Sequence, residues 1–320
     1  MSISSTNFQR AIVIGGSMAG LLTARVLSNH FTQVILLERD EIRDQPEARK
    51  GQPQTRHLHG LLAKGLETML AYFPTLVEDL IAGGALVTDM GQGMRWYTFG
   101  GYRRQFQSGM TGALMSRPFL EWQIRRHVLA LPNVRVIDGC AVEGLTMNVE
   151  RSRVTGVQLS RGNGDPQATT LTADLVVDAG GRGSASPKWL AEIGYAKPVV
   201  SLVKARVGYA TRLYRRKPGD LDGADLLMIA PDAPHGKRTG LIFPLKATAG
   251  SAPWAAGPAT IRRPMRPAFW PCPKFARSRS TPDAYAAGAD LGDHFAQVPR
   301  QSAPSLRRSE ALSRRVSGAG

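Results

Sequence analysis

The feature that most constrains the fold of this chain is a short apolar run that leads into a glycine-rich turn. Residues 11–14, Ala-Ile-Val-Ile, are uniformly apolar and β-prone, as is typical of a parallel strand buried on both faces. The turn that follows has the pattern Gly15-x-Ser17-x-x-Gly20, and the apolar positions of residues 18–29 recur at helical spacing. We therefore predict a strand, a tight turn and a helix whose N-terminus points at the turn.

This arrangement predicts a site for a pyrophosphate group. Unpaired backbone N–H groups and the positive end of the helix dipole converge at the turn, where side chains are small. Ser17 replaces the middle glycine of the usual fingerprint, and its hydroxyl can reach a phosphate oxygen. A second apolar strand, residues 34–37, ends at Glu38, whose carboxylate can bind both hydroxyls of an unphosphorylated adenosine ribose. For the fingerprint alone, a glycine-rich turn in another parallel α/β protein remains an alternative.

Composition excludes several classes of protein. The 320 residues suffice for one large α/β domain or two smaller ones. Since no apolar run approaches a membrane span and the N-terminus lacks a signal-peptide core, we predict no integral membrane segment and a cytoplasmic location. Cys140 and Cys272 have no metal or redox spacing, and His57 and His59 have no apparent third ligand, so we predict no metal site.

The net charge of +16 fits a solvated basic surface, a nucleic-acid partner or an anionic membrane. Much of it lies between residues 250 and 320, where eleven basic residues face four acidic ones. That region is rich in Pro, Ala, Ser and Arg, and it lacks both a hydrophobic period and interleaved aromatic residues. We predict an irregular, disordered tail over residues 249–320 and no nucleic-acid partner.

Between these ends the pattern predicts further elements. A polar, turn-rich segment at residues 49–60 opens into a helix at 61–70, and Ser116 precedes a proline suited to the first turn of another helix. Glycines and aromatic residues alternate over 83–112, which we interpret as short strands whose rings form sheet core, with an aromatic ligand pocket as the alternative. Further strands are expected at 134–137, 141–149, 154–159, 226–230 and 239–245, with partial alternation over 199–214.

A further apolar strand, within residues 173–184, leads into a run of glycines as the strand at residues 11–14 does. Two such strands far apart in one chain predict a ligand that the same sheet contacts twice, as a dinucleotide as long as FAD requires. Five stretches follow in order: Gly15-x-Ser17-x-x-Gly20, Glu38-Arg39, Arg49-x-Gly51, Ser116-Arg117-x-x-Leu120, and Asp174-x-x-x-Asp178-Ala179-Gly180-Gly181-Arg182-Gly183-Ser184. In these stretches, over roughly residues 8–247, the chain resembles the FAD-dependent monooxygenases of the p-hydroxybenzoate hydroxylase type.

The resemblance implies an α/β fold with a Rossmann-like, three-layer FAD-binding domain, interrupted by a substrate-side antiparallel sheet and followed by an irregular C-terminal tail. The implied boundaries are 1–190 for the FAD-binding domain, with an inserted segment at about 60–112, then 191–248 for part of the substrate-side sheet and 249–320 for the tail.

The resemblance also implies which residues bind the cofactor. Glu38 would hold the adenosine ribose, and Arg49 and Arg117 would contact the FAD phosphates or ribityl chain. The family's second motif has Asp-Gly where this chain has Gly180-Gly181, with Asp178 two residues earlier. The full set of cofactor-binding residues implied is Gly15, Gly16, Ser17, Met18, Ala19, Gly20, Glu38, Arg39, Arg49, Arg117, Asp178 and Gly181.

The implied activity is a flavin monooxygenase that uses NADPH or NADH and O₂ on an aromatic or polyketide-like small molecule. The sequence identifies no catalytic acid or base. The family's third motif, Gly-Asp followed by a proline and a glycine pair, is absent, because Gly292-Asp293 lacks that continuation; this predicts a C-terminally truncated or frame-altered form. The alternatives are a catalytically incomplete nucleotide-binding remnant and a flavin reductase of the same architecture. A halogenase is disfavoured, because the Trp-x-Trp-x-Ile-Pro signature is absent.

Overall fold

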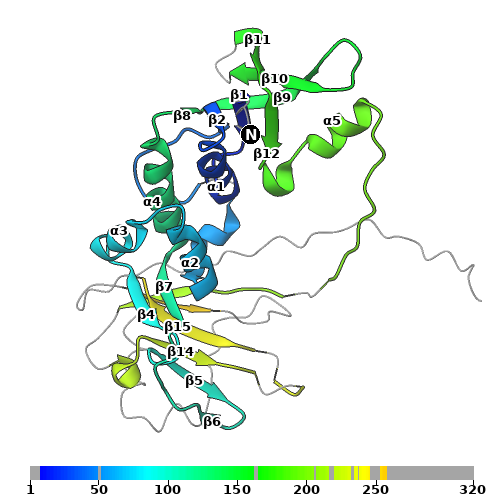
Figure 1. Ribbon diagram of the computed structural model, residues 1–320. Helices are drawn as coiled ribbons and strands as arrows, with labels where there is room; N and C mark the ends of the chain where they lie inside the picture. Colours follow the sequence, from blue (N-terminus) through cyan, green and yellow to red (C-terminus); the bar gives the residue numbers. More distant parts are fainter. Residues whose placement is uncertain are drawn as a thin grey trace, which may run out of the picture.

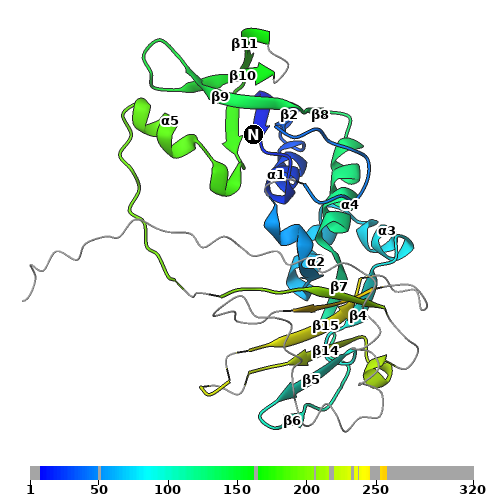
Figure 2. The same ribbon diagram turned by 180° about the vertical axis from the view of Figure 1, so that it is seen from behind.

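The computed structural model describes residues 8–49, 52–161, 165–204, 207–215, 220–231, 234–236, 238–245 and 253–257. Two sheet-containing parts lie end to end in this fold: a parallel sheet with its covering layers at one end, and a six-stranded sheet at the other (Figures 1 and 2). The predicted α/β class, with a Rossmann-like part beside a largely antiparallel sheet, is confirmed.

The parallel sheet holds the first glycine turn. It contains four strands in the order β12-β1-β2-β8, namely β1 (Phe8–Ile14), β2 (Phe31–Leu37), β8 (Val134–Ile137) and β12 (Leu175–Asp178). All three pairings are parallel, and Ala11, Ile12 and Val13 in the centre of β1 have no exposed surface. The uniformly apolar run is therefore a strand buried on both faces, as predicted.

Layers of different kinds cover the two faces of this sheet. Helices α1 (Met18–Leu27) and α4 (Arg117–Leu129) pack on one face, and an antiparallel sheet of β9 (Cys140–Met147), β10 (Val154–Arg161) and β11 (Asp165–Thr172) packs on the other. Because successive side chains of a strand alternate, Val13 belongs to the core on the helix side and Ile12 to the core against β10. This is the predicted three-layer arrangement.

The other end of the molecule is built from two sheets that share a small core. The smaller sheet has the order β3-β7-β4, with β3 (Leu58–Leu61), β4 (Leu86–Asp89) and β7 (Thr111–Ser116). The larger has the order β13-β16-β15-β14-β5-β6, with β5 (Met94–Thr98), β6 (Gly101–Tyr102), β13 (Arg212–Arg215), β14 (Leu226–Ile229), β15 (Gly240–Pro244) and β16 (Pro253–Gly257). Leu114 of β7, Leu226 and Phe243 form the buried contact between them.

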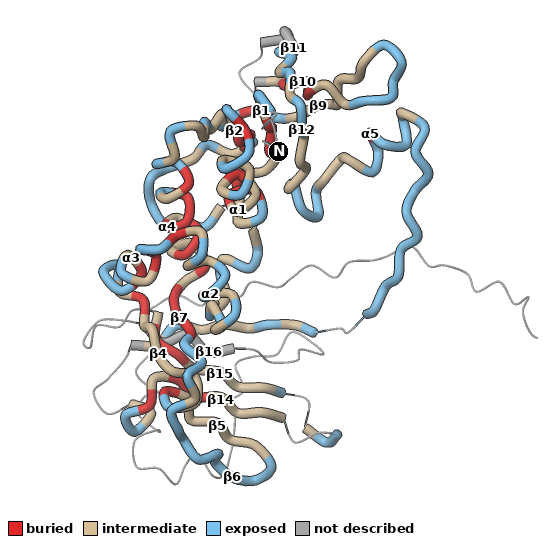
Figure 3. Tube along the Cα trace, in the orientation of Figure 1, coloured by how far each residue is buried: buried red, intermediate tan, exposed pale blue. Residues whose placement is uncertain are grey.

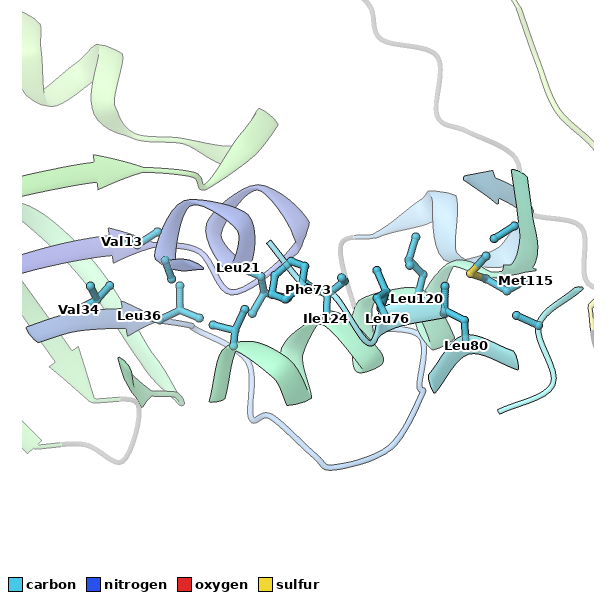
Figure 4. Close-up of a cluster of buried hydrophobic side chains, with 14 of the residues drawn as sticks. Val13, Leu21, Val34, Leu36, Phe73, Leu76, Leu80, Met115, Leu120 and Ile124 are labelled. Atoms are coloured by element: carbon cyan, nitrogen blue, oxygen red, sulfur yellow. The ribbon is translucent and has the colours of Figure 1, made fainter. Parts of the chain in front are cut away.

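Helix α4 connects the two ends through its buried face. Its N-cap, Ser116, accepts a hydrogen bond from the Phe119 N–H at 3.3 Å, and Pro118 lies in the first turn, so the predicted helix start is confirmed. Side chains of α4 continue the core from the parallel sheet to β7 (Figure 4), and the buried trace in Figure 3 follows the same line. The labelled members of this core are Val13, Leu21, Val34, Leu36, Phe73, Leu76, Leu80, Met115, Leu120 and Ile124.

The remaining helices are short and lie at the edges of these layers. They are α2 (Ala63–Leu70), α3 (Leu76–Ala82), α5 (Ser186–Glu192) and the 3₁₀ turns η1 (Pro53–Arg56), η2 (Gly181–Gly183) and η3 (Asp220–Gly223). Within the described residues, none of the helices has the length and apolar character needed to cross a membrane.

Several expectations were wrong. Phe99, Tyr102 and Phe106 are 88%, 49% and 62% exposed, so these rings are not sheet core. Tyr102 belongs to the edge strand β6, and the Phe106 N–H donates to the Gly91 carbonyl between β4 and β5. Residues 199–204 and 207–211 form no strand, because no neighbouring strand pairs with them despite their partly alternating apolar and polar residues. Among the described residues of 199–215, the strand is β13.

The region expected to be an irregular tail contains a strand, β16, which pairs with β13 and β15. Backbone pairing with two neighbours can hold such a segment without a hydrophobic period of its own. Residues 249–252 and 258–320 of the predicted tail, Cys272 and Gly51 lie outside the described residues. Strand β11 was not predicted, because its polar, threonine-rich sequence has no apolar alternation.

Candidate functional site

The two glycine turns lie side by side at the carboxyl edge of the parallel sheet. The Ala179 N–H donates to the Ile14 carbonyl at 2.8 Å, which extends the β1–β12 pairing to the point where both strands end. Gly15 has a φ of +100°, and a Cβ there would lie 2.8 Å from the Ala179 carbonyl oxygen. The sheet therefore brings its two glycine-terminated strands together, as the sequence predicted.

The first turn of α1 approaches this edge closely. A Cβ at Gly20 would lie 1.7 Å from the Gly15 carbonyl oxygen, so only glycine fits where the helix crosses the turn. Ser17 is the N-cap, followed by Met18 and Ala19, and no acidic side chain lies in the first turn. The first N–H groups of a helix have no partners within it, and the positive end of the helix dipole lies there, so this end of α1 is suited to an anion.

Glu38 lies beside the turn at the end of β2. Its Oε2 accepts a hydrogen bond from the Gly16 N–H at 2.8 Å and lies 2.9 Å from Arg49 Nη1, while its Oε1 accepts from the Asp40 N–H at 3.1 Å. The side chain is 8% exposed. The carboxylate is therefore fixed against the glycine turn.

Arg49 links two buried carboxylates that come from distant parts of the chain. Its Nη2 donates to the Gly16 carbonyl at 3.1 Å and to Glu121 Oε1 at 2.5 Å, and its Nη1 contacts Glu38. The third nitrogen, Nε, is buried and has no hydrogen-bond partner in the described part of the chain. A guanidinium N–H without a protein partner can donate to an anion such as a phosphate group.

Glu121 is the centre of this cluster. Its Oε2 accepts a hydrogen bond from the Ser17 hydroxyl at 2.7 Å and lies 3.3 Å from Arg117 Nη2, and Gln52 Nε2 donates to Ser17 Oγ at 3.0 Å. The side chain is 4% exposed. We call Ser17, Glu38, Arg49, Arg117 and Glu121 the buried charge cluster.

The protonation of this cluster follows from its pairing. Burial alone would lower the pKa of Arg49, but the charges of Glu121 and Glu38 outweigh it, and the pKa lies above its usual value. Burial would raise the pKa of Glu121, yet the Ser17 hydrogen bond and the two guanidinium groups hold that pKa below its usual value. The pKa of Arg117 is lowered by burial and by the positive charge of Arg49. Arg49 and Glu121 are therefore both charged at neutral pH.

The structure does not bring every predicted residue into the cluster. The Arg39 side chain is 68% exposed and lies 3.7 Å from Asp40. Asp178 accepts hydrogen bonds from the Gly180 N–H and from the hydroxyls of Ser184 and Ser186, so it holds the second glycine turn in shape. Burial alone would raise the pKa of Asp178, but the hydrogen bonds outweigh it, and the pKa lies below its usual value. Gly181, with a φ of +65°, opens η2, and a Cβ added there would have no atom within 4 Å.

Sequence reasoning missed Glu121. A signal for Glu121 was present, because it follows Arg117 by four residues on a predicted helix, the spacing at which opposite charges meet. Its contact with Arg49 spans 72 residues and had no local signal.

The two histidines lie outside the buried charge cluster, but His59 is near enough to Arg117 for the charge of that side chain to act on it. His57 Nδ1 is 2.9 Å from the Thr211 hydroxyl, and burial lowers the pKa of both His57 and His59, for His59 together with the charge of Arg117. Within the described residues, no group of three His, Cys, Asp or Glu side chains is placed to hold a metal ion.

Comparison with known proteins identifies the fold. No protein-family model matches the chain. The protein Rv3254 of Mycobacterium tuberculosis strain H37Rv is 37% identical over 242 residues, which cover 72% of this chain and 49% of Rv3254. The chain thus spans about half the length of this curated relative.

Solved structures match at lower identity. PqsL of Pseudomonas aeruginosa, described as a probable FAD-dependent monooxygenase, has a TM-score of 0.54 at 15% identity, over 78% of this chain and 59% of PqsL. The 2-methyl-3-hydroxypyridine-5-carboxylic acid oxygenase has a TM-score of 0.52 at 19% identity, and the match covers 80% of this chain and 60% of the oxygenase. The flavin-dependent halogenase CmlS has a TM-score of 0.53 at 18% identity, and the match covers 80% of this chain and 42% of CmlS. The fold is that of FAD-dependent monooxygenases and halogenases.

Proposed function

We propose that the chain is an FAD-dependent oxidoreductase of the flavin monooxygenase kind, which uses NADPH or NADH and O₂ on an aromatic or polyketide-like small molecule. The observation that carries the proposal is the carboxyl edge of the parallel sheet. There the close turn at Gly15 and Gly20, the α1 N-terminus and the buried charge cluster surround one place with donors on one side and a carboxylate on the other.

The residues present fit the ADP half of FAD. The first-turn N–H groups of α1 and the guanidinium groups of Arg49 and Arg117 would hold the pyrophosphate, since each offers a donor to an anion. The buried Nε of Arg49 is such a donor without a protein partner among the described residues. Glu38 would accept hydrogen bonds from the adenosine ribose, and the turn at Asp178 and Gly181 would contact the cofactor a second time.

When bound, FAD supplies the redox chemistry of oxygen transfer, and the protein supplies binding, orientation and exclusion of water. The six-stranded sheet faces the parallel-sheet part across β3 and β7, and we place the organic substrate on that side. A small organic molecule as substrate is supported by one structure of similar fold, because PqsL has been solved in complex with 2-aminobenzoylacetate. A nucleotide-binding remnant and a flavin reductase of the same architecture are the competing functions.

The absorption spectrum of the purified full chain tests the proposal. After incubation with FAD and gel filtration, we expect the protein fraction to carry the visible absorption of oxidised flavin, because the ADP-binding groups are buried and preorganised. A second measurement, NADPH- or NADH-dependent bleaching of that absorption without oxygen, separates an oxidoreductase from a remnant that merely binds the nucleotide. A colourless protein fraction at saturating FAD would refute the proposed function.

Replacing Glu38 with glutamine should weaken FAD and ADP binding about 5- to 150-fold, the effect of about 1–3 kcal/mol for a lost charged hydrogen-bond acceptor. The reason is that the carboxylate is the acceptor next to the Gly16 N–H at the place proposed for the ribose. Fluorescence titration of FAD and calorimetry with ADP measure it. Glu41→Gln is the matched control, since that side chain lies in the same loop and is 76% exposed. Equal affinities for the two variants would remove Glu38 from the ribose site.

A further inference from the structure

The hairpin of β5 and β6 carries an exposed aromatic side chain in a strained position at its tip. Thr98 pairs with Gly101, which leaves a two-residue loop of Phe99 and Gly100 with φ values of +48° and +84°. Two positive φ values define the type I′ turn, which favours Asn or Gly at its first position. A phenylalanine there is disfavoured by its Cβ, and its ring is 88% exposed. The turn therefore presents a large apolar group to the solvent at a cost in stability.

The surroundings of Phe99 combine aromatic rings with arginine side chains. Tyr102 is 49% exposed, packs edge-on against Tyr97 at 5.2 Å and lies under the Arg95 guanidinium at 4.5 Å. Arg103 and Arg104 follow on the edge strand's exposed continuation. We call Phe99, Tyr102, Arg103 and Arg104 the hairpin tip.

The charge of the hairpin tip is positive and is not balanced along the chain. No acidic residue occurs between Met90 and Leu120. Asp222 pairs with Arg95, so that charge is compensated. Arg103 stacks on Trp96 at 4.1 Å, and neither Arg103 nor Arg104 has an ion pair with a described residue. The tip thus keeps two uncompensated positive charges beside an exposed apolar ring.

The shape and composition of the hairpin tip select the kind of partner. The hairpin lies at the end of the molecule away from the parallel sheet in both views (Figures 1 and 2). A stable protein interface uses about 20–30 residues a side, far more than a hairpin end offers. A lipid surface can be contacted by a smaller area, because an aromatic ring at the interface and each arginine facing anionic headgroups contribute separately to reversible attachment.

We propose that the hairpin tip is a site for peripheral contact with an anionic membrane surface, with Phe99 inserted among the lipids and Arg103 and Arg104 facing the headgroup phosphates. The proposal does not depend on the function proposed above. It assigns a membrane-facing surface to the β5–β6 end of the six-stranded sheet.

Sedimentation of the full chain with vesicles tests the proposal. We expect binding to vesicles of phosphatidylcholine with phosphatidylserine and much weaker binding to phosphatidylcholine alone. Phe99→Asn should lower the partition coefficient about tenfold, the effect of withholding one large apolar side chain from lipid. Asparagine suits the turn, so the thermal midpoint of this variant should not fall. Because the substitution leaves the charge unchanged, the basic residues elsewhere in the chain cannot account for the difference.

Two further variants complete the test. Arg103→Ser combined with Arg104→Ser should lower the partition coefficient about 25-fold, because each positive charge near an anionic surface contributes roughly fivefold. The double variant should also bind with a weaker dependence on salt. Val149→Asn is the matched control and should bind as the wild type does, because Val149 is 95% exposed in a different hairpin turn. Equal binding by Phe99→Asn and the wild type would overturn the proposal. A change in oligomeric state by light scattering with unchanged vesicle binding would also overturn it, in favour of a contact between copies of the chain.

Discussion

Replacing Arg49 with methionine should lower the free energy of unfolding by about 3–5 kcal/mol, because the change leaves two buried carboxylates without their shared cation. Glu38 and Glu121 approach this guanidinium at 2.9 and 2.5 Å, and the three side chains are at most 8% exposed. Since a domain is stabilised by about 5–15 kcal/mol, the loss is a large fraction of the total. The same variant should no longer retain FAD on gel filtration. Urea unfolding and FAD titration measure the two effects.

A second substitution distinguishes lost charge pairing from lost packing. Adding Glu121→Gln to Arg49→Met should recover part of the stability, because it removes one of the uncompensated buried charges. FAD binding should not recover, since the guanidinium donors remain absent. An unfolding midpoint for Arg49→Met equal to that of the wild type would show that the two carboxylates do not depend on this arginine.

The wild type should also lose this stabilisation in acid. The folded-state pKa of Glu121 lies below the ordinary value of 4.5, so its contribution is complete above that pH and is lost as the pH falls toward the folded-state pKa. Glu121→Gln should flatten that part of the stability profile.

The sequence was sufficient for the elements whose signals are local. The buried strand at residues 11–14, the glycine turn and the helix begun by Ser116 each follow from apolar period or turn and cap chemistry within a few residues. The approach of Gly15 to Ala179 could also be expected, because the carboxyl ends of parallel strands meet at one edge of a sheet.

The sequence was insufficient where partners are distant along the chain. Glu121 acquires its role from Arg49, 72 residues away, and β16 is a strand only because β13 and β15 flank it. Phe99 shows the opposite failure, since an aromatic residue in a β-prone stretch indicates core, whereas its place in a two-residue turn exposes it. Which side of a strand or turn becomes buried is decided by the neighbouring elements.

Replacing Gly20 with alanine should abolish FAD retention and lower the free energy of unfolding by about 3 kcal/mol or more. The added Cβ would lie 1.7 Å from the Gly15 carbonyl oxygen and 2.9 Å from its carbon, and both are backbone atoms that no side-chain rotation can move aside. Helix α1 must then shift away from the turn, and its first-turn N–H groups leave the place proposed for the pyrophosphate. Urea unfolding and gel filtration with FAD measure both consequences.

Gly144→Ala is the matched control for this prediction, because a Cβ there meets only the Gln158 Oε1 at 3.6 Å, an ordinary contact. That variant should unfold and bind FAD as the wild type does, since it adds the same methyl group to a strand of the covering sheet. The thermal midpoint measured with and without ADP separates loss of the phosphate site from loss of stability in Gly20→Ala. If the helix shift removes the pyrophosphate site, ADP should no longer raise the thermal midpoint of this variant, although it raises that of the wild type. A Gly20→Ala protein that keeps both its stability and its response to ADP would mean that the α1 N-terminus does not hold the cofactor phosphates, and the site would then have to be sought away from the glycine turn.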